Sequence, residues 1–207
     1  MKNVSTMLGN DKVVPVVTIR SVEQALSLAA ALQEGGINVI EVTLRTPAAL
    51  DCIAALKREN SGMLVLAGTV TTPQLMRDVS EAGADGAISP AYSSLLLEAA
   101  KQVDMPFLPG VATPSEVLAG MEAGLDEFKL FPATAVGGLS LLKGIGAPMP
   151  KAKFCPTGGL NESNFTDFLA LQNVMCVGGS WMVPSLAVNE NDWAAVTSKV
   201  KHTLSRI

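Results

Sequence analysis

Short apolar runs of strand length alternate along the chain with longer amphipathic segments of helical length. The apolar runs recur about every 20 to 25 residues, which is the spacing expected of successive βα units. They follow one another without a linker or a low-complexity segment. We predict strands at Val13–Thr18, Val39–Leu44, Met63–Gly68, Gly86–Ser89, Phe107–Gly110, Glu127–Phe131, Lys153–Thr157 and Met175–Gly178.

Helix signals stand between these runs. Ser21 is a capping residue in front of an amphipathic segment that ends at Gly35-Gly36. Thr72-Pro73 and Thr113-Pro114 place proline at the first helical position shortly after a strand. The pattern therefore predicts strand and helix in strict alternation.

Eight βα units predict a single domain over residues 1–207, an α/β protein with the (β/α)8 TIM-barrel fold. An open, doubly wound sheet of about six strands is the alternative if the short runs at Gly86 and Phe107 are not strands. No Gly-x-Gly-x-x-Gly turn follows the first strand, so a dinucleotide site is not expected.

Glu41, Thr43 and Arg45 form a polar face on the second predicted strand, because strand side chains alternate between two faces. In a barrel, the aliphatic face packs against helices. The polar face then projects inward, with Arg45 nearest the C-terminal mouth. The alternative is a half-exposed strand whose Glu41 and Arg45 form a surface ion pair.

Lys129 places an amine in the middle of the apolar run Glu127–Phe131. If both faces of that strand are covered, the ammonium is partly buried, and burial favours the neutral form. A neutral amine can attack a carbonyl group and form a Schiff base. The alternative is a lysine at a hydrated strand end with its stem along the sheet.

Glycine or polar residues end the other predicted strands at the same edge. Gly158-Gly159 and Gly179-Ser180 follow the last two strands, where barrel enzymes often hold a phosphate with backbone N–H groups and a short helix, here from Pro184. A nucleophilic amine, a carboxylate, an arginine suited to a carboxylate and a phosphate site together suit a phosphorylated keto acid.

Composition narrows the classes of partner. The chain has 48% hydrophobic and 16% charged residues, and its net charge of -4 comes without a dense Lys/Arg stripe, which argues against nucleic acid. No apolar run has the length of a membrane span, and residues 1–6 lack the apolar stretch of a signal peptide. We therefore expect a cytoplasmic protein.

Metal ligands and alternative nucleophiles are few. Cys52, Cys155 and Cys176 have no short Cys-x-x-Cys spacing, so we expect reduced, buried thiols. His202 is the only histidine, and we expect it to be solvated on the C-terminal helix. Neither a His-based triad nor a metal site is expected.

Six segments resemble the motifs of the 2-keto-3-deoxy-6-phosphogluconate (KDPG) and 4-hydroxy-2-oxoglutarate aldolases, in order and over nearly the whole chain. They are Glu41–Thr46, Ala67–Val70, Ala87–Pro90, Glu127–Pro132, Phe154–Gly159 and Gly178–Trp181. The resemblance implies a class I aldolase, commonly a homotrimer, that cleaves KDPG to pyruvate and glyceraldehyde 3-phosphate in the Entner-Doudoroff pathway. It implies a covalent imine and no cofactor.

The same resemblance implies roles for individual residues. The catalytic positions are Lys129 as the Schiff-base lysine and Glu41 as the general acid/base. The substrate positions are Arg45 and Thr69 at the pyruvyl carboxylate end, Pro90 and Phe131 as pocket walls, and Thr157. The phosphate positions are Gly158, Gly159, Gly179 and Ser180.

Some alternatives stay open. Thr134 stands where many relatives carry glutamate, at a position that is not catalytic in the family. Thr157 favours gluconate-type specificity, whereas galactonate-type relatives tend to carry an apolar residue; the galactonate epimer of KDPG and 4-hydroxy-2-oxoglutarate remain alternative substrates. Other hypotheses are a sugar-phosphate isomerase or epimerase, in which Lys129 only provides charge, and a catalytically silent sugar-phosphate sensor.

Overall fold

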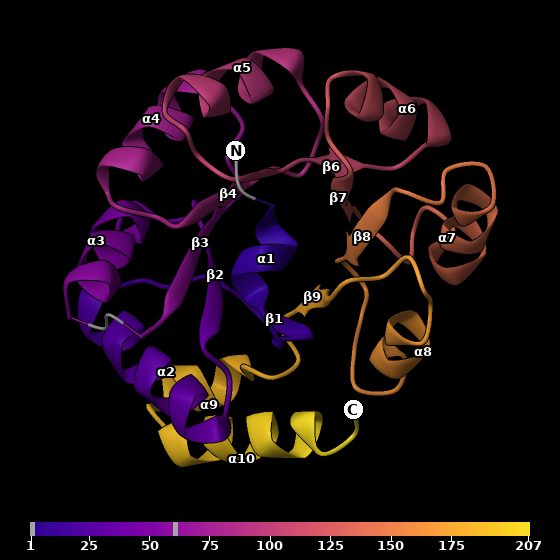
Figure 1. Ribbon diagram of the computed structural model, residues 1–207. Helices are drawn as coiled ribbons and strands as arrows, with labels where there is room; N and C mark the ends of the chain where they lie inside the picture. Colours follow the sequence, from indigo (N-terminus) through magenta and orange to yellow (C-terminus); the bar gives the residue numbers. More distant parts are fainter. Residues whose placement is uncertain (1–2, 60–61) are drawn as a thin grey trace.

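The strands lie at the centre of the molecule and the helices surround them (Figure 1). The computed structural model describes residues 3–59 and 62–207, so positions 1 and 2 of the N-terminal segment considered above lie outside the described residues. Within those two ranges, no helix is both long enough and apolar enough to cross a membrane.

The strand segments match the predicted runs closely. They are β1 (Val13–Val17), β2 (Val39–Thr43), β3 (Leu64–Gly68), β4 (Gly86–Ile88), β5 (Phe107–Leu108), β6 (Gly110–Val111), β7 (Glu127–Leu130), β8 (Lys153–Pro156) and β9 (Val177–Gly179). The last strand begins at Val177 rather than at Met175, and the predicted fifth strand is divided in two.

Parallel pairing closes these strands into a ring. One sheet has the order β5-β4-β3-β2-β1-β9 and a second has the order β6-β7-β8. The isolated parallel bridges Phe154–Val174 and Thr157–Gly178 join β8 to the segment that contains β9, while β5 leads directly into β6. The (β/α)8 barrel is confirmed, and the open-sheet alternative is wrong.

Pro109 divides the predicted fifth strand. Proline has no backbone N–H and therefore cannot donate to a ladder of hydrogen bonds. β5 pairs with β4, β6 pairs with β7, and the Pro109 carbonyl accepts a hydrogen bond of 2.8 Å from the backbone N–H of Lys129. One short run thus changes partner at Pro109 and connects the two sheets.

Several helices begin where the sequence signals them. The helices are α1 (Val4–Leu8), α2 (Val22–Gly35), α3 (Ala49–Glu59), α4 (Pro73–Glu81), α5 (Ser94–Gln102), α6 (Pro114–Glu122), α7 (Gly138–Gly146), α8 (Phe165–Leu169), α9 (Ser185–Asn189) and α10 (Trp193–Leu204). The side chains of Ser21, Thr72 and Thr113 each accept a hydrogen bond from a backbone N–H in the first turn, which confirms these N-caps.

Helix α1 closes the N-terminal end of the barrel, and the sequence analysis did not predict it. It lies across the middle of the ring in Figure 1. Ser5 donates hydrogen bonds from its backbone N–H, at 3.1 Å, and from its hydroxyl to the carboxylate of Glu127, which is 7% exposed. Glu127, at the end of β7 opposite to the mouth of the barrel, therefore anchors α1 to the barrel.

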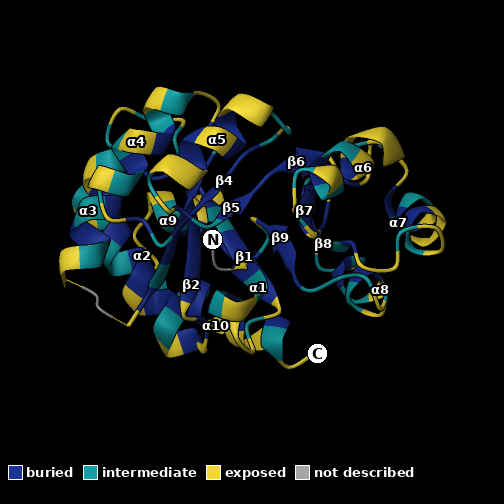
Figure 2. Cartoon of the chain, turned by 45° about the horizontal axis from the view of Figure 1, so that its top comes forward, coloured by how far each residue is buried: buried dark blue, intermediate teal, exposed yellow. Residues whose placement is uncertain are grey.

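The pattern of buried and exposed residues is the one expected of a barrel. The strands and the inward faces of the helices are buried, whereas the outer helix faces are exposed (Figure 2). Cys52, Cys155 and Cys176 are buried and free, as expected. The His202 side chain is largely exposed in the last turn of α10 and contacts Glu162, which confirms a solvated histidine.

Gly110 has no side chain, and this allows β6 to pass close to the loop that follows β4. A Cβ at this position would lie 2.7 Å from the backbone nitrogen of Ala91 and would overlap the Pro90 carbonyl. Because backbone cannot move aside cheaply, we expect Gly110→Ala to lower the free energy of unfolding by about 1–3 kcal/mol. Urea unfolding measures the change.

Gly144→Ala is the matched control, since a Cβ there on helix α7 meets nothing within 4 Å. This control should be neutral or stabilise by about 0.5–1 kcal/mol, because alanine favours the helix. Equal midpoints for the two variants would contradict the close approach of β6 to the β4 loop.

Candidate active site

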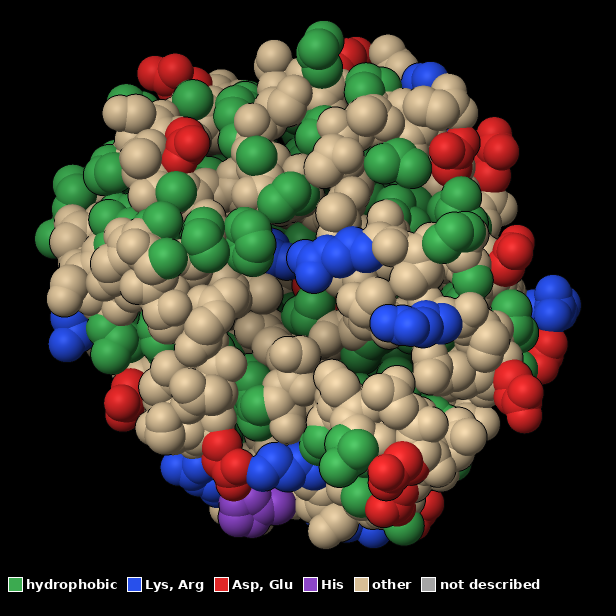
Figure 3. Space-filling model, turned by 180° about the vertical axis from the view of Figure 1, so that it is seen from behind, with side chains coloured by type: hydrophobic (Ala, Val, Ile, Leu, Met, Phe, Trp, Pro, Cys, Tyr) green, Lys and Arg blue, Asp and Glu red, His purple; other side chains and the backbone are tan. Residues whose placement is uncertain are grey.

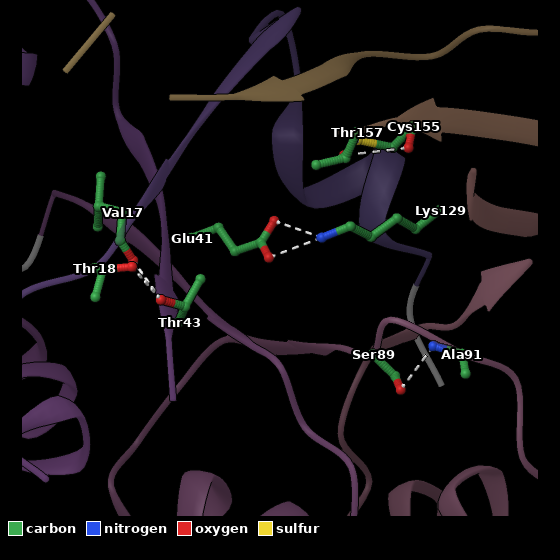
Figure 4. A network of polar contacts seen from close by, with 9 residues as sticks. All are labelled: Val17, Thr18, Glu41, Thr43, Ser89, Ala91, Lys129, Cys155 and Thr157. Carbon is green, nitrogen blue, oxygen red and sulfur yellow. Dashed lines mark hydrogen bonds and ion pairs between the residues drawn. The ribbon is translucent and has the colours of Figure 1, made fainter. Parts of the chain in front are cut away.

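Lys129 and Glu41 form a buried ion pair inside the barrel. Glu41 extends from β2 and Lys129 from β7, and the two side chains point toward each other (Figure 4). Lys129 Nζ lies 3.0 Å from Glu41 Oε1 and 3.4 Å from Oε2, and the two residues are 5% and 2% exposed. Neither a lysine at a hydrated strand end nor a surface pair of Glu41 with Arg45 is correct.

Gly68 provides the space for the Glu41 carboxylate. The two residues lie on neighbouring strands, where Glu41 pairs with Leu66 and Thr43 pairs with Gly68. A Cβ on Gly68 would come within 2.8 Å of Glu41 Cγ and 2.9 Å of Cδ. The orientation of Glu41 toward Lys129 therefore depends on a residue without a side chain at the end of β3.

A cavity of about 420 Å³ opens at the end of the barrel where the strands terminate. Figure 3 shows this face, with a central hollow and blue Lys or Arg side chains beside it. Its lining contains most of the residues singled out from the sequence, namely Arg45, Phe131, Thr157, Gly158, Gly159, Gly179 and Ser180. The structure thus brings together residues from four strand ends.

The ion pair lies deeper than the cavity lining and is connected to it by Phe131. The Phe131 ring lines the cavity, and its centroid is 5.4 Å from Lys129 Nζ. Thr69 and Pro90 are not part of the lining and sit half-buried on the loops after β3 and β4. Thr69 has a φ of 66°, an uncommon conformation for a β-branched residue that is often found at functional sites.

The lining carries positive charge. Arg45, after β2, and Arg20, after β1, both line the cavity, and neither guanidinium group forms an ion pair within the part of the chain that the structure describes. Arginine presents several N–H donors in a planar fork that matches a carboxylate or a phosphate. The cavity is therefore suited to an anionic molecule.

Free backbone N–H groups add to this preference at the β8 and β9 ends. The carbonyls of Gly158 and Gly159 accept hydrogen bonds from Thr134 and Asn164. In contrast, the N–H groups of Gly159 and Ser180 donate to no other group among the described residues. Two unsatisfied donors beside one cavity are well placed to bind an anion.

Cys155 on β8 and Thr157, which directly follows β8, lie beside the ion pair. Cys155 pairs in register with Lys129, and its Sγ lies 3.8 Å from Thr157 Oγ1 (Figure 4). A hydrogen bond with Cys176 lowers the pKa of the Cys155 thiol, against the opposing effect of burial and with support from the charge of Lys129. Among the described residues, the Thr157 hydroxyl makes only this contact and a 3.5 Å contact to the Cys155 carbonyl, which leaves it available to a ligand.

Several contributors escaped the sequence analysis, among them Arg20, which it did not mention. Gly68 was noted only as a strand end, Cys155 only as a buried thiol, and Thr134 only as a departure in a loop. The Gly68 role has a sequence signal, since a glycine beside a strand with an inward carboxylate leaves room for it. The contact of Thr134 with the Gly158 carbonyl depends on the packing of two distant loops, and nothing local in the sequence indicates it.

Comparison with known proteins identifies the family. The model of the family described as KDPG and KHG aldolase, where KHG is 4-hydroxy-2-oxoglutarate, matches residues 4–199. The chain belongs to the KDPG and KHG aldolase family. This aldolase is 44% identical to the KHG/KDPG aldolase of Escherichia coli (strain K12), and the match covers 99% of this chain and 98% of the relative.

Solved structures agree with this assignment. The KDPG aldolase of Legionella pneumophila, with pyruvate captured as a covalent carbinolamine intermediate, has a TM-score of 0.93 and 44% identity, covering 96% and 97% of the two chains. The KDPG aldolase of Zymomonas mobilis ZM4, with 3-phosphoglycerate, has a TM-score of 0.92 and 38% identity, covering 98% and 95%. The fold and the class I aldolase assignment are thereby confirmed.

The dependence of Glu41 on Gly68 is testable in this aldolase. In Gly68→Ala the new methyl group pushes the Glu41 carboxylate away from Lys129. We expect the fold to be retained, because the atoms that must move belong to the flexible Glu41 side chain and not to the backbone. We expect turnover to fall about 100-fold, the scale of loss for a 1 Å misplacement in an active site. Steady-state kinetics and a crystal structure of the variant measure both effects.

Gly144→Ala on the outer helix α7 serves again as control and should keep full turnover. Unchanged turnover in Gly68→Ala would show that the observed orientation of Glu41 is not needed for the reaction.

Proposed function

We propose that Lys129 is the Schiff-base nucleophile and Glu41 the general acid/base of an aldolase that cleaves KDPG to pyruvate and D-glyceraldehyde 3-phosphate. The observation that carries the proposal is the 3.0 Å contact between Lys129 Nζ and Glu41 Oε1, buried below a cavity lined with cations and free N–H groups. A buried amine next to a carboxylate can lose its proton to that carboxylate and so become a nucleophile.

In the first half of the reaction, neutral Lys129 attacks the C2 ketone of the substrate. Glu41, directly or through a water molecule, returns a proton to the carbinolamine oxygen, and loss of water gives an iminium ion. The iminium acts as the electron sink that the next step requires. Its charge develops where the Glu41 carboxylate lies, which stabilises it.

In the second half, Glu41 removes the proton of the C4 hydroxyl through a water molecule. The C3–C4 bonding electrons move to the iminium, and D-glyceraldehyde 3-phosphate leaves as the aldehyde. The remaining enamine is protonated at C3. Hydrolysis of the resulting imine releases pyruvate and regenerates Lys129.

The residues that line the cavity orient the substrate above Lys129 and Glu41. We assign the C1 carboxylate to Arg45 and the half-buried Thr69, with Phe131 and Pro90 as walls. The C6 phosphate is assigned to the remaining polar end of the cavity, formed by Gly158, Gly159, Gly179 and Ser180. Free N–H donors at that end support the assignment, since they match the acceptor oxygens of a phosphate.

The proposal also covers the domain organisation, the oligomeric state, the location in the cell and a second substrate. It includes one domain over residues 1–207, a homotrimer, a cytoplasmic location, and a second activity on 4-hydroxy-2-oxoglutarate, which gives pyruvate and glyoxylate. The galactonate epimer of KDPG is the alternative phosphorylated substrate. A sugar-phosphate isomerase or a silent sensor would use the same cavity without an imine.

Borohydride trapping tests the nucleophile. Reduction in the presence of pyruvate should attach a three-carbon adduct to Lys129, which peptide mass spectrometry locates. Lys129→Arg keeps the charge near Glu41 but cannot form the imine, so pyruvate release in a coupled lactate dehydrogenase assay should fall by at least about 1,000-fold.

Substantial turnover of Lys129→Arg would favour the isomerase alternative, and ligand binding without pyruvate release in the wild type would favour the sensor. Lys143→Arg, at an exposed position of α7, is the control and should trap and turn over normally.

Thr157 supports discrimination between the two epimers. Its hydroxyl makes only long contacts with the residues that the structure describes, so it is free to bind a substrate hydroxyl. Thr157→Val should lower kcat/KM for KDPG about threefold to tenfold and reduce the preference for KDPG over its galactonate epimer. Thr166→Val on α8, outside the cavity lining, is the control; an unchanged preference in Thr157→Val would remove Thr157 from the specificity argument.

A further inference from the structure

Thr18 is an additional polar residue of the cavity that the sequence analysis did not single out. It directly follows β1, is exposed, and lines the cavity. β1 lies between β2 and β9 in the sheet, so Thr18 stands between the strand of Glu41 and Arg45 and the strand that leads to Ser180. A substrate that spans the cavity from the carboxylate end to the phosphate end passes Thr18 at its middle.

The hydrogen bonds around Thr18 fix the direction of its proton. Thr43 Oγ1 lies 2.8 Å from the Val17 carbonyl oxygen, which can only accept, so the Thr43 proton points there. Thr43 Oγ1 also lies 3.0 Å from Thr18 Oγ1 (Figure 4). Because Thr43 has no second proton, Thr18 is the donor in this second bond.

The arrangement makes Thr18 a hydrogen-bond acceptor toward the cavity. Its proton is used on Thr43, whereas the lone pairs of its oxygen have no donor among the described residues. Thr43 is 1% exposed, so water cannot replace the bond if Thr18 turns away. A molecule in the cavity therefore gains from Thr18 only by presenting a donor group.

KDPG has few donors to offer. Its carboxylate and phosphate are acceptors at neutral pH, C2 carries the carbonyl and C3 carries no hydroxyl. The C4 hydroxyl gives its proton to Glu41 in the proposed reaction. The donor that remains is the C5 hydroxyl, located between the cleaved bond and the phosphate, which is also where Thr18 stands between the two ends of the cavity.

We propose that Thr18 is a specificity-determining residue that accepts a hydrogen bond from the C5 hydroxyl of the substrate, which is the C2 hydroxyl of the aldehyde product. The inference rests on the proposed aldolase function and adds a requirement to it. Thr18 selects aldehydes that carry a hydroxyl next to the carbonyl carbon. Glyoxylate, the aldehyde from 4-hydroxy-2-oxoglutarate, has no such hydroxyl and gains nothing from Thr18.

The test uses aldol synthesis with pyruvate and two aldehydes that differ by one hydroxyl, D-glyceraldehyde 3-phosphate and 3-phosphonooxypropanal. Both carry the phosphate, so the phosphate contacts stay constant. Thr18→Val removes the hydroxyl and keeps the branched shape. We expect kcat/KM for glyceraldehyde 3-phosphate to fall about threefold to tenfold, the value of one neutral hydrogen bond, with less than about a twofold change for the deoxy aldehyde.

Thr18→Ser is the conservative variant and should restore the discrimination between the two aldehydes. Equal losses of kcat/KM for both aldehydes in Thr18→Val would assign Thr18 a structural role. No loss for either aldehyde would show that Thr18 does not contact the substrate. Each of these results overturns the inference about Thr18 and leaves the proposed aldolase function standing. A wild-type enzyme that condenses pyruvate with neither aldehyde would instead overturn the proposed function. The two failures are therefore distinguishable.

Discussion

The buried ion pair between Lys129 and Glu41 is the interaction on which the rest of the site depends. Removal of a carboxylate and an ammonium from water costs several kcal/mol for each ion, and the cost is offset only when the two charges meet in good geometry. Here they meet at 3.0 Å from strands on different sheets of the ring. A closed barrel can hold these strands at a fixed separation, whereas an open sheet would leave one partner exposed.

The surrounding residues serve this pair in different ways. Gly68 leaves the volume that the carboxylate occupies, and the Phe131 ring, which lines the cavity, lies 5.4 Å from the ammonium. At the end of β7 opposite to the cavity, Glu127 accepts hydrogen bonds from Ser5 of α1, so a second carboxylate on β7 does not compete for Lys129. The two carboxylates are thus separated by the positions along the barrel of the groups that they contact.

Much of the fold was predictable from local patterns. The alternation of apolar runs and capped helices indicated every strand region and the N-caps at Ser21, Thr72 and Thr113. The division at Pro109 and the helix α1 were missed for different reasons. A proline can end a strand or lie within one, and only its neighbours decide; α1 is a short helix whose stability comes from packing on the barrel floor and from Glu127.

The sequence by itself determined the barrel class, the inward face that carries Glu41, and the family whose motif contains Lys129. Strand periodicity and the motifs can be recognised from residues that are neighbours in the chain. Only the tertiary structure decided that Lys129 meets Glu41, that the Gly159 and Ser180 N–H groups find no acceptor among the described residues, and that Thr18 is oriented by Thr43. These facts depend on contacts between strands far apart in the chain, and hydrogen-bond direction follows from which atoms those contacts bring within reach.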